Sequence, residues 1–455
     1  MEPKPHRGPS QLRPVRDGIH NNDEDAAVSG LSGTTSVVTP DPKSLPRLFP
    51  SGGMTSLTEH LAWYGPLPSR SSDLIRDVEA AGLRGRGGAG FPTAIKMAAV
   101  AGRRGRAVVV ANGTEGEPAS SKDKTLLGSA PHLVLDGATL AAEAVGARSI
   151  IVCVERTQVA SLTILTRAIE DRKRAGLDRV EITIEGAPDR YVAGEESALV
   201  HWLNGGEAKP TFVPPRPFEK GVGGRPTLVD NVETLAHVGL IGRYGSSWFR
   251  SLGTAEDPGT TLLTLSGAVA RPGVYEVPGG SSLVSVLEGA GAVTDSLQAV
   301  LIGGYFGTWL PRSQLQEVDL GATSLRGAGS SLGCGMVFAL STDACGLEES
   351  ARVARWLAGE NAGQCGPCVF GLDSLAATLE GMVVGGWDAH ASSERVQSLL
   401  HQIAGRGACK HPDGAVRFVQ STLRVFAAEI ARHAEHGRCG RSAGHLPTPT
   451  PGAWR

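Results

Sequence analysis

The first half of the chain alternates between short, continuous apolar runs and longer segments in which apolar residues recur three and four positions apart. The short runs have the length of buried strands, and the longer segments have the spacing of helices. This alternation is typical of an α/β domain with a mostly parallel sheet. The predicted strands are residues 107–111, 149–154 and 180–184, and the predicted helices are residues 132–146 and 156–175.

A polar turn at residues 112–118 directly follows the first predicted strand. Ligands of parallel sheets bind beyond the carboxyl ends of the strands, so a site is expected there. A second candidate is the glycine-rich segment 85–96, which holds four glycines together with Arg86 and Lys96. Glycine lets a ligand approach the main chain, and amides at a helix start attract anions. The segment suits a bound phosphate, although an ordinary loop has the same spacing.

The pattern changes to short alternating strands near residue 260 and becomes helical near residue 348. Short strands indicate a small β-rich module, and the helical part favours a four-helix bundle. The predicted bundle helices are residues 350–358, 371–383, 393–404 and 415–436. The predicted boundaries are a disordered tail at 1–46, an α/β domain at 47–255, a β-rich module at 256–330, a helical domain at 345–437 and a second disordered tail at 438–455.

Composition excludes several classes of function. The formal net charge of -2 gives no electrostatic footprint for nucleic acid or an anionic membrane. No uninterrupted apolar run reaches the roughly 18 residues of a membrane helix, and the N-terminal region lacks the apolar core of a secretory signal. The seven cysteines are an odd number and lie mostly in the C-terminal part. We therefore expect a cytoplasmic protein with reduced thiols, no direct membrane insertion and no nucleic-acid partner.

Three cysteines form a candidate metal site. Cys365 and Cys368 make a CxxC motif with proline before the second cysteine, and Cys409 follows about forty residues later. Proline beside a ligating cysteine is common in iron–sulfur proteins. A thioredoxin-type dithiol, a zinc site completed by His411, and plain buried thiols are the alternatives.

The remaining cysteines differ in their surroundings. Cys153 lies in an apolar strand and Cys439 in the C-terminal tail, and both are expected to be inert. Cys345 comes shortly before the bundle, from where it could approach the metal-binding loop.

Two pairs of carboxylates, Glu115 with Glu117 and Glu195 with Glu196, lie in glycine-containing loops at strand ends. Such pairs usually belong to a solvated surface. Their position in these loops favours a ligand-facing role here.

Taken in order, six segments resemble the NADH-binding flavoprotein subunit of respiratory complex I and its relatives in soluble hydrogenases and formate dehydrogenases. The resemblance extends over residues 74–436. It implies an α/β FMN-binding domain, then a small β-grasp module of the SLBB type, then a C-terminal α-helical iron–sulfur bundle. The matching segments are residues 83–96, 112–123, 191–199, 225–235, 360–368 and 409–415.

The resemblance implies an oxidoreductase in which NAD(H) or NADP(H) gives a hydride to FMN and single electrons pass to a 4Fe-4S cluster. The acceptor would be a ferredoxin-like or thioredoxin-like subunit, and the chain could belong to a larger redox complex. By this resemblance the FMN residues are Gly85, Arg86, Gly87, Lys96, Asn112, Glu115, Gly194, Glu195, Asp230 and Asn231. The dinucleotide residues are Gly88, Phe91, Glu117, Tyr191 and Glu196, with Glu117 and Glu196 as candidate catalytic residues, and the cluster ligands are Cys365, Cys368 and Cys409.

Four positions depart from the family pattern. Ala362 stands where the family has its first cluster cysteine, which leaves a 3Fe-4S cluster, or a 4Fe-4S cluster with a further ligand such as Cys345 or His411. Thr114 replaces an aspartate near the flavin, and two stacking phenylalanines are replaced by Arg216 and Ala99.

Arg216 has two interpretations. Its guanidinium plane can stack on adenine and pair with a 2′-phosphate, which would favour NADPH. Alternatively it is a solvated loop residue beside a weakened nucleotide site.

Two other functions are consistent with the sequence. A non-catalytic paralogue could keep the fold as a scaffold or electron relay, and a zinc-stabilised binding protein could use the same thiols.

Overall fold

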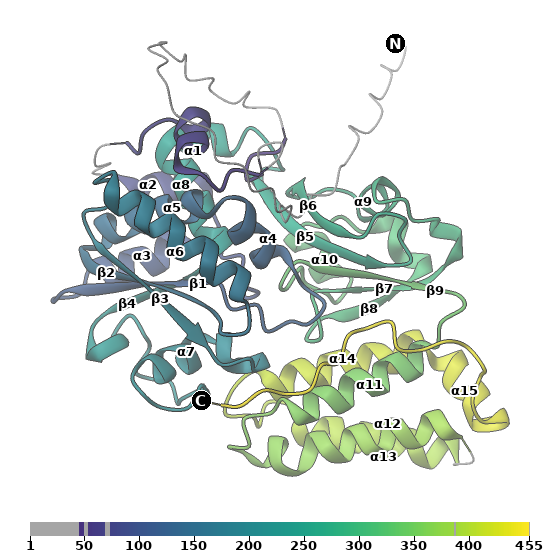
Figure 1. The fold of residues 1–455 in the computed structure, drawn as a ribbon. Helices are drawn as coiled ribbons and strands as arrows, with labels where there is room; N and C mark the ends of the chain where they lie inside the picture. The colour runs from purple at the N-terminus through teal and green to yellow at the C-terminus, as the bar shows by residue number, and fades with distance from the viewer. Residues whose placement is uncertain (1–44, 50–52, 69–72, 386–387, 455) are drawn as a thin grey trace, which may run out of the picture.

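The computed structural model describes residues 45–49, 53–68, 73–385 and 388–454. All but the last two residues of the predicted N-terminal tail lie outside these ranges. Three units follow one another along the chain: an α/β unit, a β-rich unit beside it, and a helical bundle that lies against both (Figure 1). This is the order of units predicted from the sequence.

The α/β unit is built on a four-stranded parallel sheet in the order β3-β2-β1-β4. Its strands are β1 (Ala107–Asn112), β2 (Ala147–Glu155), β3 (Glu181–Ala187) and β4 (Thr227–Asn231). The first five residues of β1 are buried, because a central parallel strand is covered on both faces. The predicted strands of this unit are confirmed. The carboxyl ends of β1 and β4 lie side by side, since Asn112 pairs with Asn231.

Helices cover both faces of this sheet. Helices α5 (Pro131–Val145) and α8 (Val232–Phe249) pack extensively and touch through their backbones. A Cβ atom on Gly137 would lie 1.7 Å from the Leu235 carbonyl oxygen, so only glycine permits this approach. The other helices are α1 (Leu57–Tyr64), α2 (Leu74–Ala81), α3 (Thr93–Ala101), α4 (Lys122–Ser129), α6 (Val159–Arg174) and α7 (Glu196–Leu203).

The β-rich unit is a five-stranded mixed sheet in the order β6-β5-β9-β7-β8. The central strand β9 pairs in parallel with β5 and antiparallel with β7. The predicted end of this module at residue 330 therefore stops short of its central strand, because the glycine- and serine-rich residues 327–335 resemble a domain boundary. Its elements are β5 (Thr260–Gly267), β6 (Gly273–Pro278), α9 (Leu283–Gly289), β7 (Leu297–Ile302), β8 (Thr308–Pro311), α10 (Ala322–Gly327) and β9 (Met336–Ser341).

Over its described residues, the helical unit contains five α-helices rather than the predicted four, because the segment 415–436 is divided at Phe426. The backbone of Phe426 has φ -103° and ψ 23°. Its ring is buried, and the centre of that ring lies 5.2 Å from the centre of the Trp309 ring of β8. The turn at Phe426 thus joins the bundle to the neighbouring sheet. The helices are α11 (Gly346–Gly359), α12 (Leu372–Val384), α13 (Ala389–Ile403), α14 (His411–Val425) and α15 (Ala427–His436).

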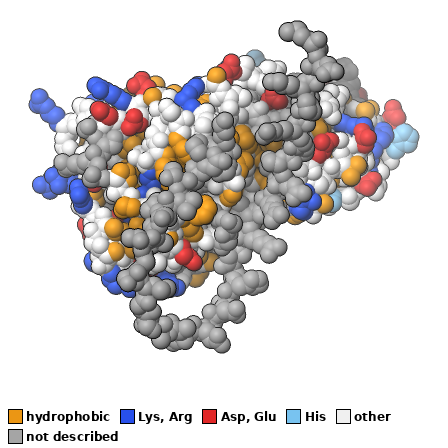
Figure 2. All heavy atoms as spheres, turned by 90° about the horizontal axis from the view of Figure 1, so that it is seen from above, with side chains coloured by type: hydrophobic (Ala, Val, Ile, Leu, Met, Phe, Trp, Pro, Cys, Tyr) orange, Lys and Arg blue, Asp and Glu red, His pale blue; other side chains and the backbone are white. Residues whose placement is uncertain are grey.

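One described helical stretch, Pro367–Val384, is long and apolar enough to cross a bilayer by length and composition, and 44% of it is buried. It includes α12, which packs against α11 and α13 within the bundle. On the face shown in Figure 2, basic and acidic side chains are interspersed around hydrophobic ones. The mixture agrees with the nearly balanced charge of the sequence.

The segment predicted as a C-terminal tail lies along the bundle over its described residues. Leu446 is fully buried, and the Trp356 indole donates a hydrogen bond of 2.7 Å to the Pro449 carbonyl. At its end the Trp454 ring lies 4.0 Å beneath the Arg190 guanidinium of the α/β unit. The proline and glycine content predicted a disordered segment, but its apolar side chains and its carbonyls contact the bundle and the α/β unit.

Candidate functional site

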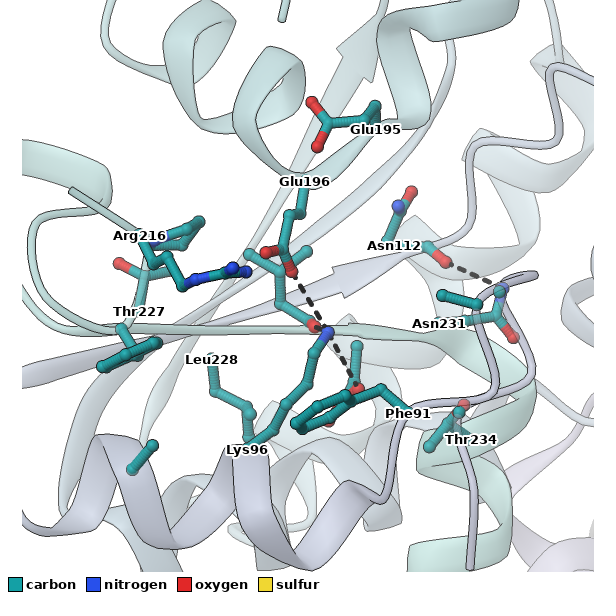
Figure 3. A pocket seen from close by; sticks show the side chains of 18 of the residues that line it. Phe91, Lys96, Asn112, Glu195, Glu196, Arg216, Thr227, Leu228, Asn231 and Thr234 are labelled. Atoms are coloured by element: carbon teal, nitrogen blue, oxygen red, sulfur yellow. Dashed lines mark hydrogen bonds and ion pairs between the residues drawn. The ribbon is translucent and has the colours of Figure 1, made fainter. Parts of the chain in front are cut away.

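A cavity of about 830 Å³ opens beside the carboxyl ends of β1 and β4. Figure 3 shows Lys96 near its centre, between Glu196 of α7 and the glycine-rich loop that carries Phe91. The α/β unit forms most of the wall, and the bundle contributes Lys410. The predicted residues on the walls are Gly85, Gly87, Phe91, Lys96, Asn112, Gly194, Glu195, Glu196, Asp230 and Asn231.

The glycine-rich loop presents main chain to this cavity. The loop is closed by a hydrogen bond of 2.8 Å from the Gly85 amide to the Phe91 carbonyl. Gly88 and Gly90 have φ of 117° and 61°, a backbone region that residues with a Cβ rarely adopt. Helix α3 begins at Thr93, so the loop leads into a helix N-terminus. The Phe91 ring is 47% exposed beside the cavity.

Lys96 is held on the cavity wall by three acceptors. Its ammonium donates to the Val229 carbonyl at 2.9 Å and lies 3.2 Å from Glu196 and 3.7 Å from Asp230. Burial opposes the charge, but the two carboxylates outweigh it and raise the pKa of Lys96. Lys96 is therefore a cation at neutral pH, with one side towards the cavity.

Asp230 is a buried carboxylate with unused hydrogen-bonding capacity. Burial raises its pKa to about 6, although the Lys96 ammonium acts against the rise. Among the described residues, none donates to its Oδ2 atom, which is buried. A buried acceptor without a partner costs about 1–3 kcal/mol. A ligand hydroxyl in the cavity would remove that cost.

Two asparagines line the cavity with their side chains already bonded. Asn112 accepts from the Thr114 hydroxyl at 2.6 Å and donates to the Gly194 carbonyl at 2.8 Å. Asn231 accepts from the Glu233 amide at 3.0 Å as the N-cap of α8, and donates to Asp123 at 2.7 Å. Thr114 therefore orients Asn112 at the position where the family has an aspartate.

Arg86 and Glu115, predicted at FMN, and Gly88, predicted at the dinucleotide, are not among the residues that line the cavity. Arg86 donates to the Thr260 carbonyl of β5 at 2.9 Å, and so joins the glycine-rich loop to the β-rich unit. Gly88 borders the same neighbouring hollow as Arg86. Glu115 is buried and accepts from the amides of Asp123 and Lys124 at 3.2 and 3.1 Å, so it caps the start of α4.

Glu117 and Tyr191, predicted at the dinucleotide, meet each other where the three units join. Glu117 accepts from the Tyr305 amide at 2.8 Å and from the Tyr191 hydroxyl at 3.1 Å. Burial raises the pKa of Glu117 to about 7. The Tyr191 ring packs edge-on against Phe306 at 4.7 Å and Trp356 at 5.1 Å. This pair connects the α/β unit to the β-rich unit and the bundle.

Lys122 was not singled out from the sequence, yet it is the centre of a buried charge network. Its ammonium lies 2.7 Å from Asp123 and 2.8 Å from Glu233. Glu233 also accepts from the Leu262 amide at 2.9 Å. Burial alone would raise the pKa of Glu233, but Lys122 lowers it to about 2. We refer to Lys122, Asp123 and Glu233 as the joint network.

Phe218 was also missed. It lines the cavity two residues after Arg216, the position at which the family has an aromatic ring. The only available signal was a nearby phenylalanine out of register with the family pattern.

The three predicted cluster cysteines lie together at one end of the bundle. Cys365 precedes the helical turn Pro367–Gly371, Cys368 is the second residue of that turn, and Cys409 precedes α14. Burial raises the pKa of Cys368 to about 12, with a contribution from Cys365, and burial likewise raises that of Cys409. Ala362, at the position of the missing fourth cysteine, is 5% exposed and its amide donates to the Cys368 sulfur.

The loop that carries Cys409, called here the cysteine loop, also borders the cavity. Lys410, next to Cys409, lines it directly. The carboxylate of Glu195, another lining residue, is close enough to contribute to the raised pKa of Cys409. The cavity and the thiols are therefore neighbours in the fold, although they are far apart in sequence.

His411 is a candidate fourth ligand with a lone pair to offer. Its Nε2 atom bonds the Leu357 carbonyl at 2.8 Å, so that nitrogen carries the proton. The Nδ1 atom is buried, and none of the described residues donates to it. Burial lowers the pKa of His411 to about 4, which keeps the imidazole neutral.

Comparison with known proteins identifies all three units. Residues 78–240 match the Nuo51 FMN-binding domain, residues 262–302 the SLBB domain, and residues 348–433 the NADH-ubiquinone oxidoreductase-F iron-sulfur binding region. In structure, the chain is similar to the NAD+-reducing [NiFe]-hydrogenase in its H2-reduced state, with a TM-score of 0.75 and 32% identity over 80% of this chain. This chain covers 63% of the length of that hydrogenase chain.

Among curated proteins, an NADH-quinone oxidoreductase F subunit of Rhizobium meliloti is 33% identical over 413 residues, which are 88% of this chain and 96% of that protein. The F subunit of the same enzyme from Mycobacterium tuberculosis is 34% identical over 386 residues, which are 81% and 86% of the two chains. The cavity, the cysteine loop and the order of units lie within these matches. The chain belongs to the family of NADH-quinone oxidoreductase F subunits.

Proposed function

We propose that this chain binds FMN in the cavity, oxidises NADH there, and delivers single electrons to an iron–sulfur cluster on Cys365, Cys368 and Cys409. The observation that carries the proposal is the position of the cavity, with Lys96 and Asp230 on one wall and Lys410 of the cysteine loop on another. Bound FMN supplies a group that takes two electrons as hydride and releases them one at a time. The protein supplies position and charge.

The residues present fit FMN. The ammonium of Lys96 and the amides of the glycine-rich loop suit a phosphate, which Lys96 would bind in exchange for Glu196. Glu196 is free to leave because its side chain is 33% exposed. The unpartnered Oδ2 atom of Asp230 suits a ribityl hydroxyl. Glu196 remains the candidate catalytic carboxylate, whereas the contacts of Glu117 favour a role at the junction of the three units.

Three side chains suit the nucleotide. Phe91 offers a half-exposed ring beside the glycine-rich loop, and Phe218 offers a second ring on the wall formed by residues 216–218. Figure 3 shows the Arg216 side chain directed into the cavity. Aromatic rings and a guanidinium plane can both stack on a base. We propose that these residues bind the dinucleotide, and that Arg216 allows NADPH as well as NADH.

The thiols fit an iron–sulfur cluster with one position left for another ligand. Between the two candidates, His411 is favoured, because it lies two residues from Cys409 and its Nδ1 lone pair is unused among the described residues. Cys345 instead contacts His433, which bonds it at 3.4 Å. We propose a 4Fe-4S cluster with His411 as the fourth ligand; a 3Fe-4S cluster would leave His411 unbound.

The names of the relatives place them in larger redox assemblies, a quinone-reducing one and a hydrogenase. We propose that this chain is likewise one subunit of such an assembly. Its electrons would leave the cluster for a ferredoxin-like or thioredoxin-like subunit.

The test is the flavin, iron, sulfide and zinc content of the untagged protein after anaerobic purification, with its visible spectrum. The proposal predicts about one FMN per chain, iron and sulfide in equal amounts, and flavin absorbance that bleaches with NADH. Iron–sulfur absorbance without flavin would instead identify an electron relay. A colourless protein that binds zinc at Cys365 and Cys368 would identify a zinc-stabilised binding protein.

A further inference from the structure

A second group of metal-ligating side chains lies at the other end of the bundle from the cluster cysteines. The group consists of Cys345, Glu429, His433 and Cys439, whose ligating atoms all lie within 4.8 Å of one another. Figure 1 shows α15, which carries two of them, at the end of the bundle away from the α/β unit. Helix α11 begins after Cys345 and ends before the CxxC loop. Its fourteen residues separate the two sites by roughly 20 Å.

His433 is prepared to bind a cation through one nitrogen. Its Nδ1 atom lies 2.7 Å from the Val383 carbonyl, which can only accept, so Nδ1 carries the proton. The Nε2 lone pair then faces Cys345, whose sulfur is 3.4 Å away. A backbone carbonyl that fixes the tautomer in this way is the usual second partner of a metal-binding histidine. His433 is fully buried, so the lone pair has no access to bulk water.

The two sulfurs come from segments that are far apart in the sequence. Cys345 is the N-cap of α11 and accepts from the Glu348 amide at 3.3 Å. This donation favours the thiolate, but burial and the neighbouring Glu429 raise the pKa of Cys345 overall, so the thiol would give up its proton only as the metal binds. Cys439 lies after α15, with its sulfur 3.9 Å from Glu429 Oε1. It is the least buried of the four residues and gives an ion a route from solvent.

Glu429 completes the group and is itself held in place. It precedes His433 by four residues on α15, so both side chains lie on one face of the helix. Its Oε2 atom accepts from the Gln298 side chain at 2.8 Å, which leaves Oε1 for an ion. Arg441 donates to the other end of Gln298 at 3.3 Å and brings a positive charge towards the group.

Two distances within the group are close to those of a tetrahedral zinc site, and the other pairs of ligating atoms lie within 4.8 Å. With Zn–S of about 2.3 Å and Zn–N or Zn–O of about 2.0–2.2 Å, neighbouring ligand atoms are separated by roughly 3.3–3.8 Å. The 3.4 Å between Cys345 and His433 falls in this range, and the 3.9 Å between Cys439 and Glu429 needs little contraction. Two thiolates, one imidazole and one carboxylate are ligands that zinc accepts, and four protein ligands are typical of a closed, structural site.

We propose that Cys345, Glu429, His433 and Cys439 bind one structural zinc ion, separate from the iron–sulfur cluster. The ion would fasten the segment that follows α15 to the start of α11. That segment is already paired there, since the Cys345 amide donates to the Ser442 carbonyl at 2.7 Å. It continues along the bundle to Trp454, which stacks under Arg190. Zinc would therefore anchor this C-terminal segment, and would stabilise the protein without contacting the cavity.

The test is the zinc content of the full chain, purified without added metal or chelator, in four forms. Wild type and Cys365→Ser/Cys368→Ser are expected to contain about one zinc per chain, because neither change touches the site. His433→Ala/Cys439→Ser is expected to contain background zinc. His401→Ala, which removes an exposed histidine of α13, is the matched control and keeps its zinc.

A second measurement avoids variants that fold poorly. Chelation of the wild-type protein should lower its thermal midpoint by several degrees, and stoichiometric zinc should restore it. Cobalt should take the same site and give the absorption of a tetrahedral thiolate complex. The proposal is overturned if wild type neither contains nor takes up zinc, or if zinc disappears with Cys365 and Cys368 but remains in His433→Ala/Cys439→Ser. Alkylation mass spectrometry that finds Cys345 joined to Cys439 as a disulfide overturns it as well.

Discussion

The charged residues around the glycine-rich loop form two groups that differ in how completely they are paired. In the joint network, Lys122 is 3% exposed between Asp123 and Glu233, which are 5% and 0% exposed. On the cavity wall, Lys96 and Glu196 are 31% and 33% exposed. The first group is closed off from water, whereas the second faces open space.

This difference separates structural from ligand-binding charge. A buried pair cannot lose one member without leaving the other charge unpaired. The joint network is therefore fixed, and it holds the α/β unit to the β-rich unit through the hydrogen bond that Glu233 accepts from the Leu262 amide. A half-exposed pair can exchange one partner for a ligand at little cost. The residues of the cavity wall can therefore bind phosphate and hydroxyl groups while the joint behind them stays fixed.

The largest effect is expected from Lys122→Ala, which leaves two buried carboxylates facing each other without their cation. Removal of one member of a buried pair costs about 3–5 kcal/mol. Soluble yield and thermal midpoint should both fall sharply. Lys124→Ala is the matched control, since Lys124 is 38% exposed and 4.0 Å from Glu155, and should change the midpoint little. Equal midpoints for the two variants would contradict the distinction between the groups.

Glu117→Gln should change how stability depends on pH. The folded pKa of Glu117, raised by burial to about 7, exceeds the ordinary glutamate value of 4.5. Its contribution to stability is therefore fully present below about pH 4.5 and is lost as pH rises through 7. A shift of this size corresponds to at most about 3 kcal/mol.

The measurement is the thermal midpoint of both proteins between pH 5 and 8. Wild type should lose more stability over this interval than Glu117→Gln, whose side chain does not titrate. Parallel curves would show that Glu117 does not titrate in this range.

Lys96→Ala should weaken FMN binding and cost less stability than Lys122→Ala, because the buried Asp230 that it leaves behind has a pKa already raised to about 6 and can take up a proton. The lost charge-assisted contact to phosphate is worth about 1.5–3 kcal/mol, or roughly 10- to 100-fold in the dissociation constant. Quenching of FMN fluorescence on addition of the flavin-free protein measures this. Lys173→Ala, at an exposed position of α6, serves as the control and should bind FMN as wild type does. An unchanged affinity in Lys96→Ala would remove Lys96 from the phosphate site.

The smallest effect is expected from Arg216→Phe. Loss of the guanidinium should lower the ratio of kcat/KM for NADPH to that for NADH several-fold, because a 2′-phosphate loses its partner and a ring remains for stacking. Steady-state rates with an artificial acceptor give both values. If the ratio stays the same, Arg216 is a solvated loop residue and the remaining dinucleotide contacts come from Phe91 and Phe218.

Periodicity predicted three of the four strands of the parallel sheet, because buried strands and amphipathic helices are decided locally. It did not predict β4, because residues 226–234 have the pattern of a helix start and only the pairing with β1 makes them a strand. It did not predict the division at Phe426, which depends on a ring fitting against Trp309 of another unit. Likewise β9 was left outside its module, because only its pairing with β5 and β7 identifies it as the centre of the sheet.

The same limit applies to the site. Lys96 was found because the glycine-rich segment that carries it has a recognisable pattern, whereas Asp230 was found only through the resemblance to the family. A sequence does not state on which side of a turn a side chain lies. It therefore could not show that Arg86 and Glu117 contact neighbouring units instead of the cavity. The proposed zinc ligands were missed for a related reason: Cys345 lies 84 residues before Glu429.

The central claim is that the cavity and the cysteine loop are close enough for electrons to pass from one to the other. It is tested most directly by an anaerobic NADH titration of the flavin- and cluster-loaded protein, followed by visible absorbance and electron paramagnetic resonance in the same samples. We predict that flavin absorbance bleaches and that the cluster becomes reduced in step with it. Bleached flavin beside a cluster that stays oxidised, although dithionite can reduce it, would contradict the claim.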